Sequence, residues 1–298
     1  FLALDVKKKT KILCTDMTWT ATINPGIIAG ANIKLVDTNN STQNVSYEKL
    51  NREIKIFKPQ IVILVHLNGE VIFDEEFNNL KKKYKFKVIE DSAQAFLSKS
   101  KKNILAGTKY EIGCFSLSIT KIIHMVYGGF CSTNSNMIAK KLTQIRNNGV
   151  NETENNFFLS SLKIAGGNFK PSNLHASIGL INLKNKEYIK KKVIEIHSIY
   201  SKNIVNDKIQ FLKRSSENFL PIYNLAIVKN RKKFIQYCHS HRINLHLNYR
   251  ALHESKILKT ANIFPNSKFI SDSLVRLPSR PGYSYSEIKK IVKIINNF

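Results

Sequence analysis

The sequence has few acidic residues and no block of basic residues interleaved with aromatic residues. Among 298 residues, 21 are acidic and 47 are lysine or arginine, so the formal net charge is +26. Such a charge raises the prospect of a nucleic-acid partner, but lysine outnumbers arginine 39 to 8 and the lysines are spread along the chain. We therefore interpret most of them as solvated charges and expect no nucleic-acid partner. The surplus would favour the approach of an anionic small molecule.

Cysteine is also scarce, and long hydrophobic runs are absent. The cysteines are Cys14, Cys114, Cys131 and Cys238. None has Cys-x-x-Cys spacing, which is typical of reduced thiols in a cytoplasmic protein. The four histidines between residues 239 and 253 fit no zinc motif, so we predict no metal site. No apolar run has the length of a membrane span, and no signal peptide is recognisable, so no membrane partner is expected.

The order of the apolar segments predicts the fold class. Strand-like and helix-like segments alternate from residue 11 to about residue 133, which is typical of a layered α/β sheet. Strands are expected at residues 12–14, 33–36, 61–65, 86–90, 112–117 and 129–132, and helices at 47–57, 73–84 and 134–147. No internal repeat or low-complexity linker interrupts this order.

A change of pattern near residue 205 predicts two domains. A long amphipathic helix is expected over about residues 172–200, and its apolar stripe is typical of core or dimer packing. Short strands and helices follow from about residue 208, with helices expected at 231–242 and 286–296. We therefore predict a large α/β domain over residues 1–205 and a small α+β domain over residues 206–298.

The segment from residue 88 to residue 129 contains the candidate catalytic groups. Asp91 lies where a short apolar strand passes into a loop, and in open α/β sheets ligands bind at this edge. A second strand-like run, at residues 112–117, places Ser116 at its end and Lys121 just beyond it. A carboxylate and an amine would thus meet over one ligand.

This pair of groups suits pyridoxal phosphate. A carboxylate keeps the ring nitrogen of that cofactor protonated, so that the ring withdraws electrons. A lysine supplies the amine for covalent attachment and then carries protons, which requires a desolvated amine of lowered pKa. Lys121 follows a run with almost no charge, unlike the lysine clusters at residues 81–83 and 190–192. The residues alone leave open whether Lys121 is catalytic or one of many surface lysines.

Several segments of the chain match one family in order. They are TWTATIN at residues 18–24, AGA at 29–31, LVD at 35–37, VHLNG at 65–69, EDSAQA at 90–95, Ser116 with Lys121, GNFK at 167–170 and LNYRALH at 247–253. Together they resemble the DegT/DnrJ/EryC/StrS family of nucleotide-sugar aminotransferases over nearly the whole chain. The resemblance implies fold type I of the pyridoxal phosphate enzymes: a mixed, mostly parallel sheet flanked by helices, with a smaller C-terminal α+β domain.

The resemblance also implies roles for individual residues. Asp91 would pair with the pyridine nitrogen, and Gln94 would contact the ring hydroxyl of the cofactor. Trp19 would stack on the ring. Ser116 would bind the phosphate, and Lys121 would be the covalently attached lysine. Asp91 and Lys121 are accordingly the expected catalytic residues.

The partners and the reaction follow from the same resemblance. Asn168 would reach the phosphate of the neighbouring subunit, so that a homodimer shares its active sites. A lysine at position 121, where some relatives have histidine, favours amino transfer over dehydration of the sugar. Glutamate would be the amino donor, and the acceptor would be the keto group of a nucleotide-linked deoxy sugar, in lipopolysaccharide or other amino-sugar synthesis. The nucleotide, the sugar and the position of the ketone remain open.

Four departures from the family pattern favour a second interpretation. The Gly-Thr/Ser-x-Ala turn that would cradle the cofactor phosphate has no counterpart, so we expect a chain truncated before Phe1. Val126 and Leu97 stand where glycine is usual, and Lys170 replaces an arginine and its bidentate fork. A non-catalytic remnant of such an enzyme is therefore an alternative, and a basic nucleic-acid-binding protein is a weaker one.

Overall fold

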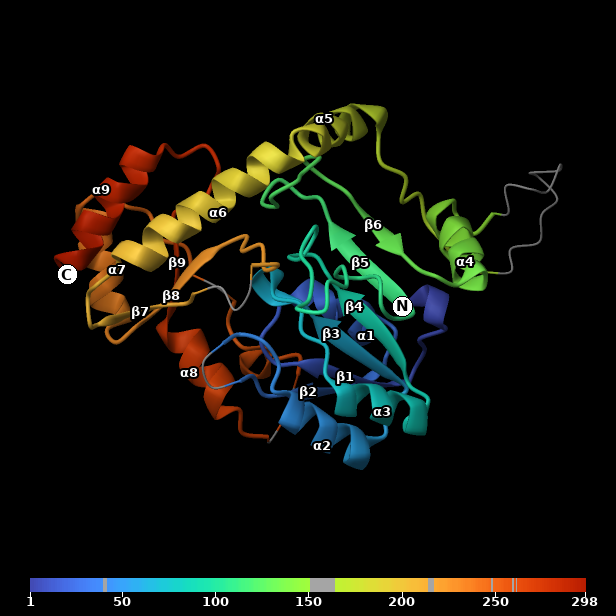
Figure 1. Cartoon of the computed structure of the whole chain (residues 1–298). Coiled ribbons are helices and arrows are strands. Elements are labelled where there is room, and N and C mark those ends of the chain that lie inside the picture. Colours follow the sequence, from blue (N-terminus) through green and yellow to red (C-terminus); the bar gives the residue numbers. More distant parts are fainter. Residues whose placement is uncertain (40–41, 151–163, 214–216, 248, 259, 261) are drawn as a thin grey trace.

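A six-stranded sheet forms the centre of the larger half of the molecule (Figure 1). The computed structural model describes residues 1–39, 42–150, 164–213, 217–247, 249–258, 260 and 262–298. In the order β2-β1-β3-β4-β5-β6, the strands are β2 (Asn32–Val36), β1 (Lys11–Thr15), β3 (Ile61–Val65), β4 (Lys87–Asp91), β5 (Ile112–Ser116) and β6 (Gly129–Ser132). The first five are parallel and β6 is antiparallel. The predicted mixed, mostly parallel sheet is thus confirmed.

Both faces of this sheet are covered at its central strands, which explains why β3 is apolar without alternation. In β3, Ile61 and Ile63 pack into one core while Val62 and Leu64 pack into the other. The helices of this half are α1 (Asn24–Ile28), α2 (Tyr47–Phe57), α3 (Glu75–Tyr84) and α4 (Asn136–Arg146). Helices α1 and α4 cover the first face, and α2 and α3 cover the second. The central strands are therefore buried along their length, whereas the edge strand β6 is largely exposed.

Side-chain caps determine where the predicted helices begin. Asp74 accepts a hydrogen bond from the amide of Phe77 at 2.7 Å, so α3 begins at Glu75, two residues after the expected start. Ser135 caps α4 in the same way. The strands expected at 61–65 and 129–132 have these bounds in the structure. Apolar runs and cap residues together set the element boundaries here.

The long helix expected over residues 172–200 is instead two helices, α5 (Asn173–Lys184) and α6 (Lys186–Asn203). They meet at Asn185, whose backbone has a ψ of 11° and whose side-chain amide donates to the carbonyl of Ile181 at 3.0 Å. Asparagine competes for backbone hydrogen bonds in this way, which interrupts a helix. Helix α6 runs from the large sheet to the C-terminal part of the chain (Figure 1).

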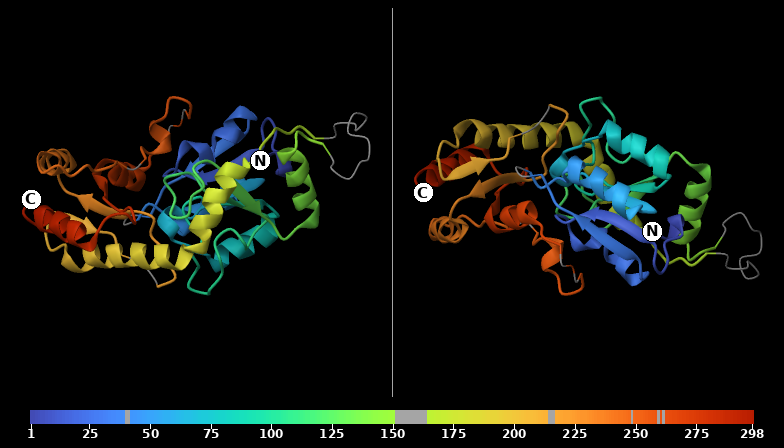
Figure 2. Two further views of the ribbon diagram at one scale, coloured as in Figure 1. Left: turned by 90° about the horizontal axis from the view of Figure 1, so that it is seen from above. Right: turned by 90° about the horizontal axis from the view of Figure 1, so that it is seen from below.

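The C-terminal part contains a smaller antiparallel sheet in the order β7-β8-β9. Its elements are β7 (Ile209–Phe211), β8 (Asn224–Val228), α7 (Arg231–Ser240), α8 (Pro265–Ser273), β9 (Leu274–Leu277) and α9 (Tyr285–Asn296). Ala226 and Val275 pack against α6, α7 and α9. Seen from above and below, the molecule is elongated, with α4 and the C-terminus towards opposite ends (Figure 2).

Ligands of open α/β sheets bind beyond the carboxyl ends of the strands, where the strand order reverses. Here the reversal is at β1, which has β2 on one side and β3 on the other. The small sheet packs towards this edge, because Leu225 and Leu274 share an apolar cluster with Met17 and Leu67. Within the described residues, no helix has the length and apolar character needed to cross a membrane.

Candidate active site

The carboxylate of Asp91 lies at the end of β4, at the edge where ligands are expected. Its Oδ2 accepts a hydrogen bond from the Thr22 hydroxyl at 2.6 Å, and its Oδ1 accepts one from the amide of Ala93 at 3.1 Å. Thr22 in turn contacts the hydroxyl of Thr18 at 2.9 Å. Asp91 is half-buried, and no lysine or arginine of the described residues forms an ion pair with it. The carboxylate is therefore oriented but retains capacity for a cationic partner.

The preceding residue, Glu90, is fully buried and fully engaged. Its carboxylate accepts hydrogen bonds at 2.9 Å from the amides of Gly107, Lys109 and Tyr110, and His66 Nε2 lies at 2.9 Å. Burial alone would raise the pKa of Glu90, but the contacts with His66 and these amides outweigh it and lower the pKa. Glu90 thus anchors the strand end that carries Asp91.

Lys121 follows β5 and is half-buried. Burial lowers the pKa of its amine, the Asp91 carboxylate acts in the opposite direction, and the positive charge of Arg276 lowers it further. No described residue accepts a hydrogen bond from the Lys121 amine or forms an ion pair with it. The Lys121 amine therefore lies within electrostatic range of the Asp91 carboxylate, as the sequence prediction requires, and has no ion-pair partner among the described residues.

Gln94 and Trp19 surround the same region. The Gln94 side chain accepts from the amide of Asn68 at 2.9 Å and donates to the Tyr249 hydroxyl at 2.5 Å. The Trp19 ring is 58% exposed, and its centre lies 5.4 Å from that of Tyr249, at an angle of 51°. Asn68 and Tyr249 had no predicted role. The signal for both was their position in the matching segments 65–69 and 247–253.

Ser116 and Asn168 lie in different surroundings. The Ser116 hydroxyl lies at the end of β5. It donates a hydrogen bond to the Ser118 hydroxyl and accepts one from the Ser118 amide, each at 3.3 Å. Asn168 is exposed and forms an isolated bridge with Asn147 after α4. Its place in a neighbouring subunit's site therefore stays a prediction. The loop expected at 149–168 lies largely at 151–163, outside the described residues.

Two residues that replace glycine have positive φ angles. Val126 has φ 69° and Leu97 has φ 68°. Residues with a Cβ rarely adopt this region, and a β-branched residue is an outlier there. The Val126 carbonyl accepts a hydrogen bond from the amide of Ile119 at 2.9 Å, so the strained residue braces the loop that carries Lys121. The expectation that glycine is favoured here is confirmed by the backbone angles.

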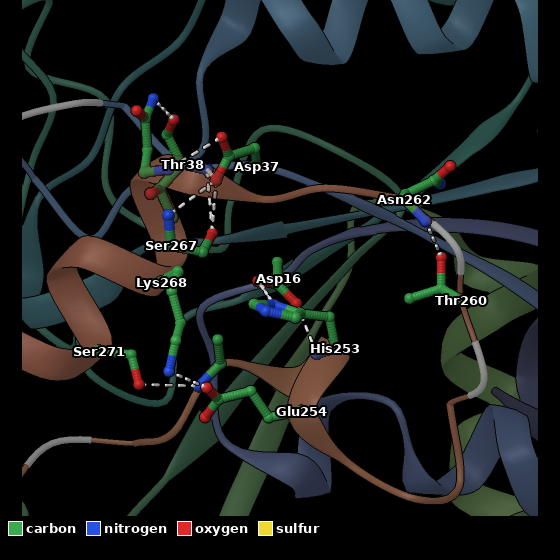
Figure 3. Close-up of polar contacts among 12 residues, drawn as sticks. Asp16, Asp37, Thr38, His253, Glu254, Thr260, Asn262, Ser267, Lys268 and Ser271 are labelled. Carbon is green, nitrogen blue, oxygen red and sulfur yellow. Dashed lines mark hydrogen bonds and ion pairs between the residues drawn. The ribbon is translucent and has the colours of Figure 1, made fainter.

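The C-terminal part docks on the carboxyl edge through two aspartates (Figure 3). Asp16, after β1, accepts from the amide of His253 at 2.8 Å, and its Oδ2 lies 2.6 Å from His253 Nδ1. Asp37, after β2, accepts from the amide and the hydroxyl of Ser267 at 2.8 and 2.7 Å, at the start of α8. Burial alone would raise the pKa of Asp37, but the hydrogen bonds of Lys49 and Ser267 outweigh it and lower the pKa.

An open hollow of about 540 Å³ lies beside α8 and is lined by residues of the C-terminal part of the chain. Its lining residues are Arg231, Leu247, Arg250, Glu254, Lys268, Ser271 and Asp272. None of them belongs to the group around Asp91 and Lys121. The hollow contains charges of both signs, and Lys268 already pairs with Glu254 and Asp272. The hollow is therefore separate from the group around Asp91 and Lys121.

Sequence relatives act on sugars attached to different nucleotides. A UDP-4-amino-4,6-dideoxy-N-acetyl-beta-L-altrosamine transaminase of Campylobacter jejuni is 28% identical over 74% of this chain and 60% of the relative. A dTDP-3-amino-3,6-dideoxy-alpha-D-galactopyranose transaminase of Aneurinibacillus thermoaerophilus is 27% identical over 99% of this chain and 81% of the relative. A GDP-perosamine synthase of Vibrio cholerae is 24% identical over 99% of this chain and 82% of the relative.

Solved structures share the fold. A DegT DnrJ EryC1 StrS aminotransferase from Brucella abortus superposes with a TM-score of 0.89 at 20% identity, over 100% of this chain and 83% of that chain. The PLP form of the putative sugar aminotransferase Spr1654 from Streptococcus pneumoniae superposes with a TM-score of 0.88 at 19% identity, over 99% of this chain and 82% of that chain. Residues 1–296 match the DegT/DnrJ/EryC1/StrS aminotransferase family. The chain belongs to this family of pyridoxal-phosphate-dependent nucleotide-sugar aminotransferases.

Proposed function

We propose that this chain transfers an amino group from glutamate to the keto group of a nucleotide-linked deoxy sugar, for surface polysaccharide or other amino-sugar synthesis. The observation that carries the proposal is Lys121, a half-buried amine of lowered pKa that has no partner among the described residues and lies near Asp91. Free cysteines support a cytoplasmic location for this activity.

The side chains around Lys121 fit pyridoxal phosphate chemically. The cofactor needs an amine for attachment, a carboxylate for its ring nitrogen, a polar group for its ring hydroxyl and a flat surface for its ring. We assign these positions to Lys121, Asp91, Gln94 and Trp19. The support is that Thr22 and the amide of Ala93 already orient Asp91, and that the Trp19 ring is exposed beside Tyr249. Ser116 is assigned to the phosphate.

When bound, the cofactor supplies an electron sink for the carbon that loses its proton. The Lys121 amine would remove and return that proton, a role that its lowered pKa favours. The Asp91 carboxylate holds a proton at the ring nitrogen throughout. Asn68 and Tyr249 hold the oxygen and the nitrogen of the Gln94 side-chain amide. The amide would therefore meet the ring hydroxyl without losing further conformational entropy.

A homodimer with shared sites is part of this proposal. Apolar side chains are spread around helix α5, yet none of its residues is buried in the single chain. Leu174, Leu180 and Ile181 are 73%, 60% and 61% exposed. Large exposed apolar surfaces of this kind are typical of protein interfaces. A second copy of the chain is the proposed occupant, and Asn168 of each copy is assigned to the phosphate of the other.

A non-catalytic remnant is the second candidate, and the positive φ angles of Val126 and Leu97 favour it. Strain beside Lys121 would weaken cofactor attachment without preventing folding. Titration with pyridoxal phosphate separates the two candidates, since an active enzyme binds one equivalent per chain and saturates. A linear, non-saturating response over the same range supports the remnant.

The direct test replaces Lys121 with alanine and uses Lys140→Ala, an exposed lysine of α4, as the matched control. After dialysis, the wild type and the control should keep the absorbance of lysine-bound cofactor, and Lys121→Ala should lose it. Retention of this absorbance in Lys121→Ala would disprove the lysine assignment. Circular dichroism of the three proteins verifies that each is folded.

A further inference from the structure

Arg276 is a cation on the inner face of the small sheet. Successive residues of β9 alternate between two faces. Val275 and Leu277 pack against the helices of the C-terminal part, whereas Leu274 packs against Met17 of the large half. Arg276 shares the face of Leu274 and pairs in register with Leu225 of β8. It is therefore directed towards the carboxyl edge of the large sheet.

Its position is fixed from the backbone and from the side chain. The amide and carbonyl of Arg276 pair with those of His246, and its guanidinium lies 3.6 Å from the centre of the Tyr223 ring. The Tyr223 amide donates to Asn68 Oδ1 at 2.8 Å, and Asn68 contacts Gln94 as described above. A continuous set of contacts thus joins the guanidinium to a residue assigned to the cofactor.

The charge of Arg276 also acts on the groups of the candidate site. It lowers the pKa of Lys121, to which burial contributes most, and it opposes the raised pKa that burial gives the Tyr249 hydroxyl. Both effects require the guanidinium to lie within electrostatic range of these groups. Arg276 and Asp91 therefore both lie within electrostatic range of Lys121.

The guanidinium has no anionic partner among the residues that the structure describes. Two other half-buried cations do have one: Lys49 pairs with Asp37 and Lys81 with Glu111, each at 2.6 Å. A cation partly removed from water is costly unless an anion compensates it. The five N–H groups of arginine form a rigid fork that matches carboxylate and phosphate oxygens. The Arg276 guanidinium is therefore suited to an anionic ligand.

We propose that Arg276 binds an oxyanion of a substrate beside Lys121, either the carboxylate of the amino donor or a phosphate of the nucleotide sugar. This inference rests on the proposed function and adds a substrate-binding residue to it. It also couples binding to chemistry. An anion seated on Arg276 offsets the charge that depresses the basicity of Lys121, so the amine becomes a better proton acceptor once substrate is present.

The test measures binding rather than turnover. Glutarate and inorganic pyrophosphate serve as probes of the two sources, and their affinities are measured by isothermal titration calorimetry with excess pyridoxal phosphate present. Arg276→Gln should weaken one probe by about 10- to 100-fold, as expected for a charge-assisted hydrogen bond. Arg276→Lys, which keeps the charge but not the fork, should give an intermediate loss. Arg52→Gln, an exposed arginine of α2, is the matched control and should bind like the wild type.

The probe that weakens identifies the source: glutarate indicates the donor carboxylate, and pyrophosphate indicates the nucleotide phosphate. Equal affinities of the wild type and Arg276→Gln for both probes, including no binding of either, would overturn the proposal. The affinity for pyridoxal phosphate should be unchanged in Arg276→Gln. If the probes depend on Arg276 but Lys121 attaches no cofactor, the proposed function fails while the oxyanion site stands.

Discussion

The carboxyl edge of the large sheet and the inner face of the small sheet border the same region but are built differently. At the carboxyl edge, Asp91, Ser116 and Lys121 come from consecutive strands close in sequence. On the inner face, Tyr223 meets Asn68 across 155 residues, and Arg276 comes from a strand still farther along. Asp91, Ser116 and Lys121 are thus placed by local chain order, whereas the residue assigned to the substrate depends on how two sheets pack together.

The same contrast occurs within one strand, between Glu90 and Asp91. Glu90 is saturated by His66 and three backbone amides, so its carboxylate has no capacity for a ligand. Among the described residues, Asp91 accepts hydrogen bonds from Thr22 and the amide of Ala93. A buried charge whose hydrogen bonds are all satisfied stabilises the fold, whereas an oriented charge with unused hydrogen-bonding capacity can bind a ligand.

The largest effect is expected from exchanging these two acids for amides. Glu90→Gln breaks a buried, paired charge and should lower the free energy of unfolding by about 3–5 kcal/mol. Asp91→Asn should change it by less than about 1 kcal/mol and instead weaken the binding of pyridoxal phosphate. Urea denaturation and cofactor titration of both variants measure the two effects, with the exposed Glu48→Gln as the control. Similar stability losses for Glu90→Gln and Asp91→Asn would remove the distinction.

A smaller effect is expected at Asp37, which joins the two regions through Ser267. Asp37→Asn loses charge-assisted hydrogen bonds and should lower the free energy of unfolding by about 2 kcal/mol at pH 7. Because the pKa of Asp37 is lowered from its ordinary 3.8, its stabilisation is complete above that value and is lost as the pH falls through the folded pKa. The difference between the wild type and Asp37→Asn should therefore shrink below about pH 4. If the difference in the free energy of unfolding between the wild type and Asp37→Asn grows as the pH falls, the stabilising role given to the Asp37 carboxylate is wrong.

Relief of backbone strain at the carboxyl edge should have a stabilising effect. Val126→Gly removes the Cβ from a residue at φ 69° and should raise the free energy of unfolding by about 1 kcal/mol. Leu97→Gly should act in the same direction by a smaller amount. Val205, exposed and outside the positive-φ residues, serves as the control, and Val205→Gly should destabilise slightly. Thermal unfolding of the three variants measures these changes in stability. Destabilisation by Val126→Gly would mean that packing of the valine side chain stabilises the fold by more than the backbone strain destabilises it.

The smallest effect tests the electrostatic link between the two regions. Arg276→Gln removes a positive charge that lowers the pKa of Lys121, so that pKa should rise. The amine is then protonated over a wider range, and its reaction with an amine-modifying reagent should begin at higher pH. Peptide mapping of modified Lys121 across pH, in protein without cofactor, measures the shift. If the pH dependence of Lys121 modification is the same in Arg276→Gln and Arg52→Gln, the charge of Arg276 does not affect Lys121.

Much of the large sheet and its edge is predictable from the sequence for physical reasons. Strands buried on both faces are continuous apolar runs, as at residues 61–65, and side-chain caps such as Ser135 mark the starts of helices. Asp91 is recognisable because it ends an apolar strand, and Lys121 because it follows a run with almost no charge. The interruption of the predicted long helix depends on one local hydrogen bond of Asn185, which competes with helical propensity.

The remaining features depend on contacts between distant parts of the chain. Thr22 reaches Asp91 across 69 residues, and Tyr249 reaches Gln94 across 155. Arg276 is one of 8 arginines, and nothing in its neighbours distinguishes it until β9 is placed beside β8. Side chains that meet through tertiary packing leave no periodic signal in the sequence. The residues assigned to substrate binding therefore emerge only from the structure.

The assignment of Lys121 is tested most directly by reduction of the cofactor-loaded protein with borohydride, followed by mass spectrometry of its peptides. Reduction makes the lysine–cofactor bond permanent and identifies which of the 39 lysines forms it. We predict one modified site, Lys121, at one cofactor per chain. Modification spread over several surface lysines, or concentrated at a lysine other than Lys121, would contradict the proposed active site.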